Sequence, residues 1–104
     1  MAWHPQSFPG NPFPNNATKL WGGAVNWRTA IAYDAMQAIL QGLRQDSSRA
    51  GLQKALSSQG FAAQGASGEI RFLPSGDREA PTVLVRVAPG TGSGTGYDFV
   101  PLSP

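Results

Sequence analysis

The sequence predicts one small α+β domain, built from two main helices, an antiparallel hairpin and a short last strand. Three observations point to this class. A chain of 104 residues suits a single domain. Apolar residues recur at helical spacing in two stretches of the helical pair expected over 27–60. Over 61–104, apolar and polar residues alternate in short runs separated by glycine and proline, as strands and their turns do.

Residues 1–26 are predicted to form a proline-rich arm with one short helix. Four prolines lie between residues 1 and 14, and each removes a backbone donor and restricts the residue before it. The arm also carries Trp3, Phe8 and Phe13, whereas a disordered tail is usually poor in aromatics, so we expect it to pack on the rest. The short helix is expected to run from Phe13 to Trp21, since Gly22 suits a C-terminal cap.

The strongest helical signal runs from Trp27 to about Arg44, with Asn26 as the N-cap. Apolar side chains recur along it every three or four residues: Ala32, Ala35, Met36, Ile39, Leu40 and Leu43. Four polar residues recur at the same spacing and form a narrow polar stripe along the helix: Asp34, Gln37, Gln41 and Arg44. Since most of its circumference is apolar, the helix should be buried on most sides, which a domain of this size has difficulty achieving.

A second helix is expected over residues 49–58, with Ser48 as its N-cap. Gly60 stands where a left-handed C-terminal cap would close this helix. A contact between Leu56 and Phe61 would then accompany the cap.

The last third of the chain predicts strands. The segments 69–73 and 82–88 alternate, and we expect them to pair as an antiparallel hairpin across a long turn. Residues 97–100 are predicted to be a short closing strand. The glycine run 90–96 has the composition of a phosphate loop, but it lies between two strands and precedes no helix, so we interpret it as a flexible loop.

The composition excludes several classes of function. Without cysteine, the chain has no disulfide, thiolate metal site or cysteine nucleophile, and its single histidine, His4, excludes a multi-histidine metal centre. A net charge of +2 with only 13% charged residues gives no concentrated basic surface for nucleic acid. No nucleophile and base stand at a catalytic spacing, so we expect neither an enzyme nor a cofactor. Residues 1–5 lack the pattern of a signal peptide.

One aromatic set near the start of the main helix suits ligand binding. Trp21, Trp27 and Tyr33 lie around the start of the main helix, close to Arg28 in the sequence. Aromatic rings can pack the aliphatic part of an amino acid or another small zwitterion while a guanidinium pairs its carboxylate. Ordinary core packing is the competing interpretation of the same rings.

Five segments also form a pattern in their order along the chain. They are 13–22 with its Leu-Trp-Gly ending, 26–35 with its Ala-Tyr-Asp-Ala core, 49–61, 65–72 with the spacing Gly-x-x-Gly-x-x-x-Phe, and the polar turn 74–78. This pattern resembles the C-terminal portion of type I periplasmic solute-binding proteins, which serve branched-chain amino acid, amide and urea transporters and also form receptor ligand-binding regions. Trp-Arg-Thr-Ala at 27–30 and Gly-Tyr-Asp-Phe at 96–99 are most similar to the cyanobacterial branch.

The resemblance implies a two-lobe α/β fold that binds solute by cleft closure, without covalent chemistry. This chain would be only its end, with most of both lobes and the signal peptide before Met1. The intact protein would be periplasmic or extracellular, would take a small amino acid or amide, and would meet the membrane permease of an ABC transporter. The resemblance places Trp27 and Tyr33 at the cleft with Arg28 behind them; an alternative placement buries Tyr33 against the sheet.

Further expectations concern the fragment alone. We expect it to bind no solute, and to self-associate as a dimer because its apolar helix face and unpaired strand edges need cover. The rival function is a ligand-sensing or protein-interaction module of a signalling receptor. A kinase, protease or membrane-anchor segment in the same reading frame would indicate that rival.

Overall fold

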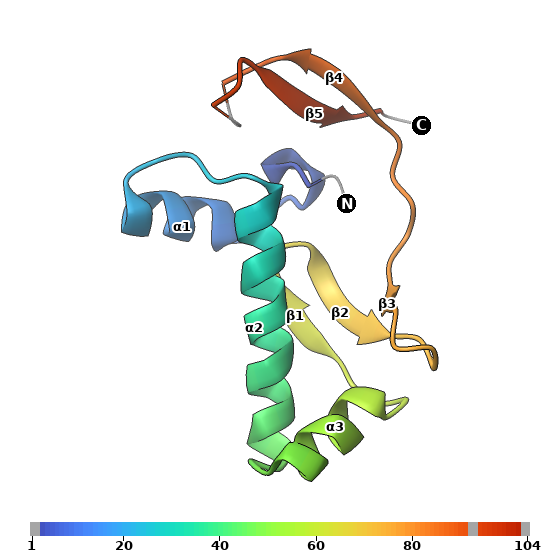
Figure 1. The fold of residues 1–104 in the computed structure, drawn as a ribbon. Helices are drawn as coiled ribbons and strands as arrows, with labels where there is room; N and C mark the ends of the chain where they lie inside the picture. Colours follow the sequence, from blue (N-terminus) through green and yellow to red (C-terminus); the bar gives the residue numbers. More distant parts are fainter. Residues whose placement is uncertain (1–2, 92–93, 103–104) are drawn as a thin grey trace.

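The computed structural model describes residues 3–91 and 94–102 and confirms an α+β arrangement (Figure 1). A short 3-10 turn, Pro5–Ser7, precedes three α-helices: α1 (Phe13–Trp21), α2 (Trp27–Gln45) and α3 (Arg49–Ser57). The strands follow: β1 (Ala63–Gly65), β2 (Gly68–Phe72), β3 (Arg78–Glu79), β4 (Val85–Pro89) and β5 (Tyr97–Pro101). They form a three-stranded sheet in the order β1-β2-β3 and a separate two-stranded sheet, β4-β5.

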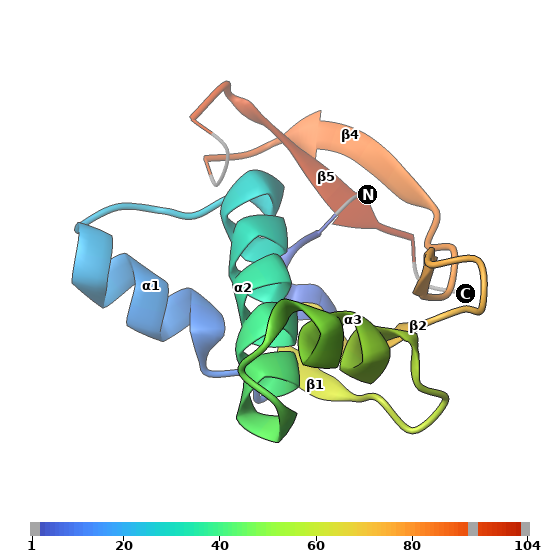
Figure 2. The same cartoon turned by 60° about the horizontal axis from the view of Figure 1, so that its bottom comes forward.

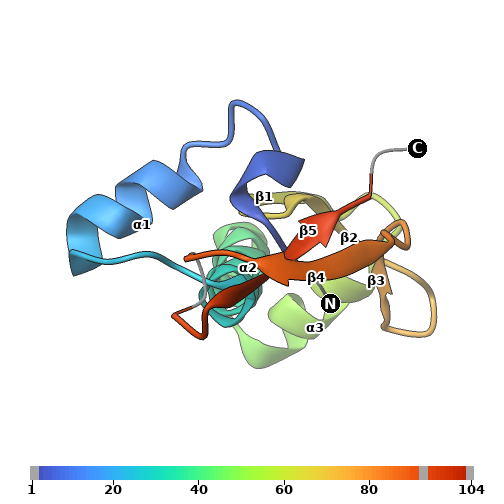
Figure 3. The same cartoon turned by 90° about the horizontal axis from the view of Figure 1, so that it is seen from above.

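The long helix α2 is the axis of the molecule (Figure 1). The β1-β2 hairpin runs along one side of it, α3 crosses it near its C-terminal end, and α1 projects from the other side (Figures 1 and 2). Seen from above, the β4-β5 hairpin lies across the N-terminal end of α2, over the N-terminal arm (Figure 3). The fold therefore brings the two ends of the described chain together at one end of α2.

The helix boundaries follow the capping residues that the sequence predicted. The Asn26 side chain accepts hydrogen bonds from the backbone N–H groups of Arg28 (2.9 Å) and Thr29 (3.5 Å) at the start of α2. Gly22 has a φ of 70° and donates its N–H to the carbonyl of Thr18, which ends α1.

The end of α3 differs from the prediction. Ser48 caps its start as expected, since its hydroxyl accepts from the N–H of Gly51 at 3.0 Å. At its other end Ser58 is extended, and Gly60 does not take a left-handed conformation. The Ser58 hydroxyl donates to the carbonyl of Ala55, which is one of the last carbonyls of α3. In a glycine cap, backbone N–H groups would donate to carbonyls at this end of the helix. Leu56 still packs on the core cluster that contains Phe61.

The predicted pairing of 69–73 with 82–88 is wrong. Antiparallel β2 pairs with β1, placing Ala63 opposite Ile70, and with β3, placing Phe72 opposite Arg78. A tight turn after β2, with the Leu73 N–H donating to the carbonyl of Asp77, places the near segment beside β2. Closing this short loop costs less entropy than closing the longer loop to residues 82–88. The predicted short closing strand is present as β5, and it pairs with β4 across the glycine-rich loop, a partner that the sequence did not predict.

The core consists of two clusters along α2. The first, at the N-terminal end, gathers Trp3, Phe13, Ala17, Ala30 and Ala66. The second, nearer α3, gathers Ala38, Phe61, Ala63 and Ile70. The aromatic arm is therefore part of the core, as its composition predicted.

The buried face of α2 is not the expected one. It consists of small or polar residues four apart: Ala30, Asp34, Ala38 and Gly42. The apolar residues Met36, Ile39 and Leu40 remain 52%, 39% and 41% exposed. Asp34, from the polar stripe, is buried because the β1-β2 turn and β3 supply hydrogen-bond donors to its carboxylate. The β1-β2 hairpin and α3 are too small to cover the rest of a 19-residue helix.

Candidate functional site

The carboxylate of Asp34 connects α2 to the turn between β1 and β2. Its Oδ1 accepts the backbone N–H of Ala66 at 2.6 Å, and its Oδ2 accepts the hydroxyl of Ser67. Gly65 makes this approach possible, since a Cβ at that position would overlap the carboxylate. The Ala-Tyr-Asp-Ala and Gly-x-x-Gly segments singled out in the sequence are thus in direct contact.

Arg78 of β3 completes this polar cluster. Its Nη1 donates to Oδ2 of Asp34 at 3.0 Å, and its Nη2 donates to the carbonyl of Ser67 at 3.4 Å. Its Nε is buried and has no hydrogen-bond partner among the described residues. Asp34 lines neither of the two pockets described below. Through these contacts the cluster anchors the sheet to α2.

The same turn holds the N-terminal arm. The indole N–H of Trp3 donates to the carbonyl of Ala66 at 3.1 Å. The side-chain amide of Asn11 donates to the carbonyl of Gly65 at 2.8 Å and, at 3.3 Å, to that of Ala66. Trp3 is consequently fixed at the N-terminal end of α2, with only 5% of its surface exposed.

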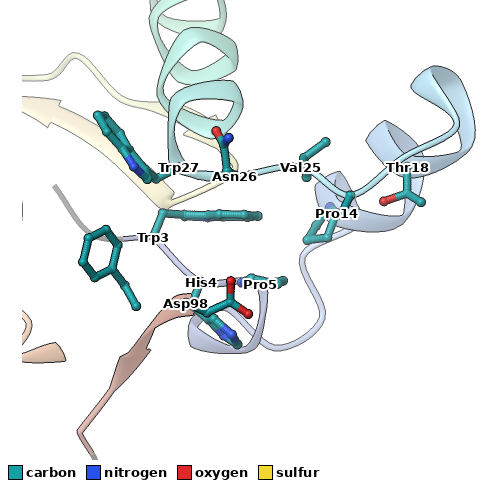
Figure 4. A pocket seen from close by; sticks show the side chains of 11 residues that line it. Trp3, His4, Pro5, Pro14, Thr18, Val25, Asn26, Trp27 and Asp98 are labelled. Carbon is teal, nitrogen blue, oxygen red and sulfur yellow. The ribbon is translucent and has the colours of Figure 1, made fainter. Parts of the chain in front are cut away.

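A pocket of about 150 Å³ opens beside Trp3, and we call it the aromatic pocket (Figure 4). Its walls come from the arm, α1, the loop before α2, the first residue of α2, and β5. The lining residues are Trp3, His4, Pro5, Pro14, Thr18, Ala24, Val25, Asn26, Trp27, Asp98 and Phe99. Its surface is mainly apolar, and one acidic side chain, Asp98, lies among the lining residues.

A second, wider pocket of about 870 Å³ lies between α1, the arm and the β1-β2 turn. Tyr33 lines it together with Phe13, and their ring centroids are 4.6 Å apart. Leu20 and Trp21 of α1, which are 75% and 59% exposed, also line it. Apolar side chains thus face water along its rim.

The structure divides the three residues that the sequence singled out. Trp27 lines the aromatic pocket, and the guanidinium carbon of Arg28 lies 4.6 Å from the centroid of its ring. That spacing places the cation over the negative face of the indole. Tyr33 lines the wider pocket instead and packs on Phe13. Trp27 and Arg28 are therefore neighbours, whereas Tyr33 faces a different cavity.

Sequence reasoning missed the other main walls of the aromatic pocket. Trp3, Asp98 and Phe99 come from opposite ends of the chain, so no local spacing connects them with Trp27. The one available signal was the aromatic content of the arm. It predicted that the arm packs on the rest of the chain, but it did not predict which residues the arm contacts. The pairing of β4 with β5, which places Asp98 and Phe99 there, was not predicted either.

Comparison with known proteins identifies no relative. No protein-family model matches the chain, and neither does any curated protein. Within the described residues, no three potential metal ligands from histidine, cysteine, aspartate and glutamate come together. No helix of the described chain has both the length and the apolar character to cross a membrane. The two pockets suit non-covalent binding, and function must be argued from them and from the fold.

Proposed function

We propose that this chain is the C-terminal part of an extracytoplasmic solute-binding protein of type I, serving an ABC-type uptake system for an amino acid or amide. One observation carries the proposal. Two of the segments that resemble that family, Tyr33-Asp34-Ala35 and Gly65–Gly68, are joined through the buried Asp34 carboxylate. A buried polar contact between the two segments is what we expect if they belong to one structural unit of that family.

The uncovered face of α2 supports the same proposal. Met36, Ile39 and Leu40 expose a contiguous apolar surface. Most of the circumference of this helix is apolar, and such a helix is normally buried. A two-lobe protein would supply a sheet to cover that face. The proposal therefore explains why the helix is more apolar than its present neighbours require.

In the intact protein, the solute binds between two lobes that close by a hinge motion, and the closed form meets a membrane permease. Trp27 and Tyr33 are our candidates for the cleft wall, with Arg28 behind them. Because most of the cleft lies outside this chain, we expect the chain alone to show no measurable affinity for amino acids. Cleft closure requires no catalytic group.

The test begins with the gene. A continuous reading frame before Met1, with alternating strand and helix patterns, would supply the remainder of the lobes. The restored protein is then titrated calorimetrically with amino acids and amides. Saturable binding supports the proposal, and a stop codon directly before Met1, or a restored protein that binds none of them, refutes it. A kinase or membrane-anchor segment in the same frame would favour the receptor module instead.

For the chain by itself we propose a dimer. The apolar face of α2 remains uncovered in the single chain, and burying it against a second copy is the simplest way to remove it from water. The exposed residues between Arg28 and Arg44 on α2 carry no charge, since Asp34 is buried. Two such faces therefore meet without like-charge repulsion.

A further inference from the structure

The aromatic pocket combines two features that recognise one kind of ligand. Rings of Trp3, Trp27 and Phe99 line it, and they come from the arm, α2 and β5. The carboxylate of Asp98 belongs to the same wall as Phe99. Figure 4 shows the Trp3 ring seen edge-on across the pocket, with the Asp98 carboxylate beneath it. Aromatic faces and a carboxylate both attract a cation, and neither attracts an anion.

The charge of the lining points the same way. Neither lysine nor arginine is found among the residues that line this pocket, and His4 is the one basic side chain in the lining. One ring of the pocket already demonstrates the interaction, since the Arg28 guanidinium carbon lies 4.6 Å from the centroid of Trp27. A compact apolar cation is the species that gains from rings and carboxylate together without losing a large hydration shell.

We propose that the aromatic pocket binds a small methylated ammonium group. The volume of about 150 Å³ admits a group of this size and excludes an extended peptide or a nucleotide. The rings of Trp3, Trp27 and Phe99 contact the methyl groups, and Asp98 balances the positive charge. The walls all belong to described residues of this chain, so the site does not depend on the solute-binding function proposed above.

Two aromatic walls of the pocket are held in position by the fold. Trp3 is fixed by its hydrogen bond to Ala66, and Trp27 is the first residue of α2, directly after the Asn26 cap. Aromatic walls that are held before the ligand arrives lose little entropy on binding. With only one small cation to hold, we expect dissociation constants in the millimolar range.

The test uses the 104-residue chain labelled with ¹⁵N and titrated with tetramethylammonium chloride at a pH of about 8, where a histidine is ordinarily neutral. Tert-butyl alcohol is the neutral probe of similar size, and sodium chloride controls for ionic strength. The indole N–H signals of Trp3 and Trp27 should shift and saturate with tetramethylammonium. That of Trp21, which lines the wider pocket, should not shift, and tert-butyl alcohol should bind at least about fivefold more weakly.

Two variants locate the site. Asp98→Asn keeps the side-chain shape and should weaken binding about fivefold or more, whereas Asp77→Asn, in the exposed turn after β2, should leave it unchanged. Phe99→Leu keeps an apolar wall without the ring and should also weaken binding. Equal affinity for the two probes overturns the proposal, and so does the lack of a saturable shift up to concentrations on the order of 100 mM.

Discussion

Arg78 of β3 and Asp34 of α2, 44 residues apart in the sequence, form an ion pair with an N–O distance of 3.0 Å. The Asp34 carboxylate is buried and also accepts hydrogen bonds from the β1-β2 turn. One side chain therefore joins the central helix to all three strands of the larger sheet. The ion pair between Arg71 and Glu69 lies at the surface and joins neighbours within a single strand, so it contributes little to the fold.

Asp34→Ala should destabilise the chain by about 3–5 kcal/mol. The substitution leaves the Arg78 guanidinium without its acid and the Ala66 N–H without an acceptor, and both groups are partly or fully buried. Urea unfolding followed by circular dichroism measures the loss. As a matched control, Asp77→Ala removes an exposed carboxylate and should change the free energy of unfolding by less than about 0.5 kcal/mol. Equal losses for the two variants would contradict the anchoring role of Asp34.

Gly65→Ala tests the close approach of the turn to α2. A Cβ at Gly65 would overlap the Asp34 carboxylate and crowd Ile70, so the turn must shift away from the helix. We expect a loss of about 1–3 kcal/mol. Gly60→Ala is the control, because Gly60 has open space around the Cβ position and an ordinary φ. The idea fails if the melting temperatures of the two variants are the same.

Local features of the sequence predicted the helices well. Asn26, Ser48 and Gly22 set boundaries through hydrogen bonds to residues within four positions, and such bonds do not depend on the rest of the fold. The aromatic arm was also predicted to pack, and Trp3 does lie in the core.

The sequence was misleading where distant segments decide the structure. The face of α2 that is buried depends on donors from Ala66, Ser67 and Arg78, which no helical periodicity reveals. Strand pairing likewise depends on loop closure between distant segments, and the tight turn from Leu73 to Asp77 places β3 beside β2. The aromatic pocket was missed for the same reason, since Trp3 and Asp98 meet only after the hairpin β4-β5 has formed.

Asp46, between α2 and α3, should make stability depend on acid pH. The backbone N–H of Ser48 donates to its carboxylate at 2.8 Å, and this bond, with the Ser48 hydroxyl, holds the pKa of Asp46 below its ordinary value of 3.8. A lowered pKa means that the folded state favours the ionised form. Its stabilising contribution is present above the ordinary pKa and is lost as the pH falls through the lower, folded-state value.

Carboxyl chemical shifts of the folded chain measure this effect directly. The titration midpoint of Asp46 should lie below 3.8. Asp46→Asn should flatten the dependence of the free energy of unfolding on pH in that acid range, because the variant has no proton to gain there. A midpoint at or above the ordinary value would contradict the inference that the hydrogen bonds from Ser48 stabilise the ionised side chain.

The exposed apolar face of α2 should control self-association. In the double variant Met36→Glu and Leu40→Glu, two charges replace side chains that are about half exposed, so folding of the single chain loses little. Burying those charges against a second copy is strongly unfavourable. Sedimentation equilibrium should show the wild type as a dimer at micromolar concentration, and the double variant should raise the dissociation constant at least about tenfold.

A matched control separates this face from apolar exposure in general. Leu84, just before β4, is 72% exposed and does not belong to α2, so Leu84→Glu adds a charge on another segment and should leave the dimer intact. If Leu84→Glu weakens association as much as the double variant, the contact lies on the β4-β5 side instead. A wild type that is monomeric across the micromolar range would mean that the α2 face tolerates water. The helix would then need no additional protein to cover it.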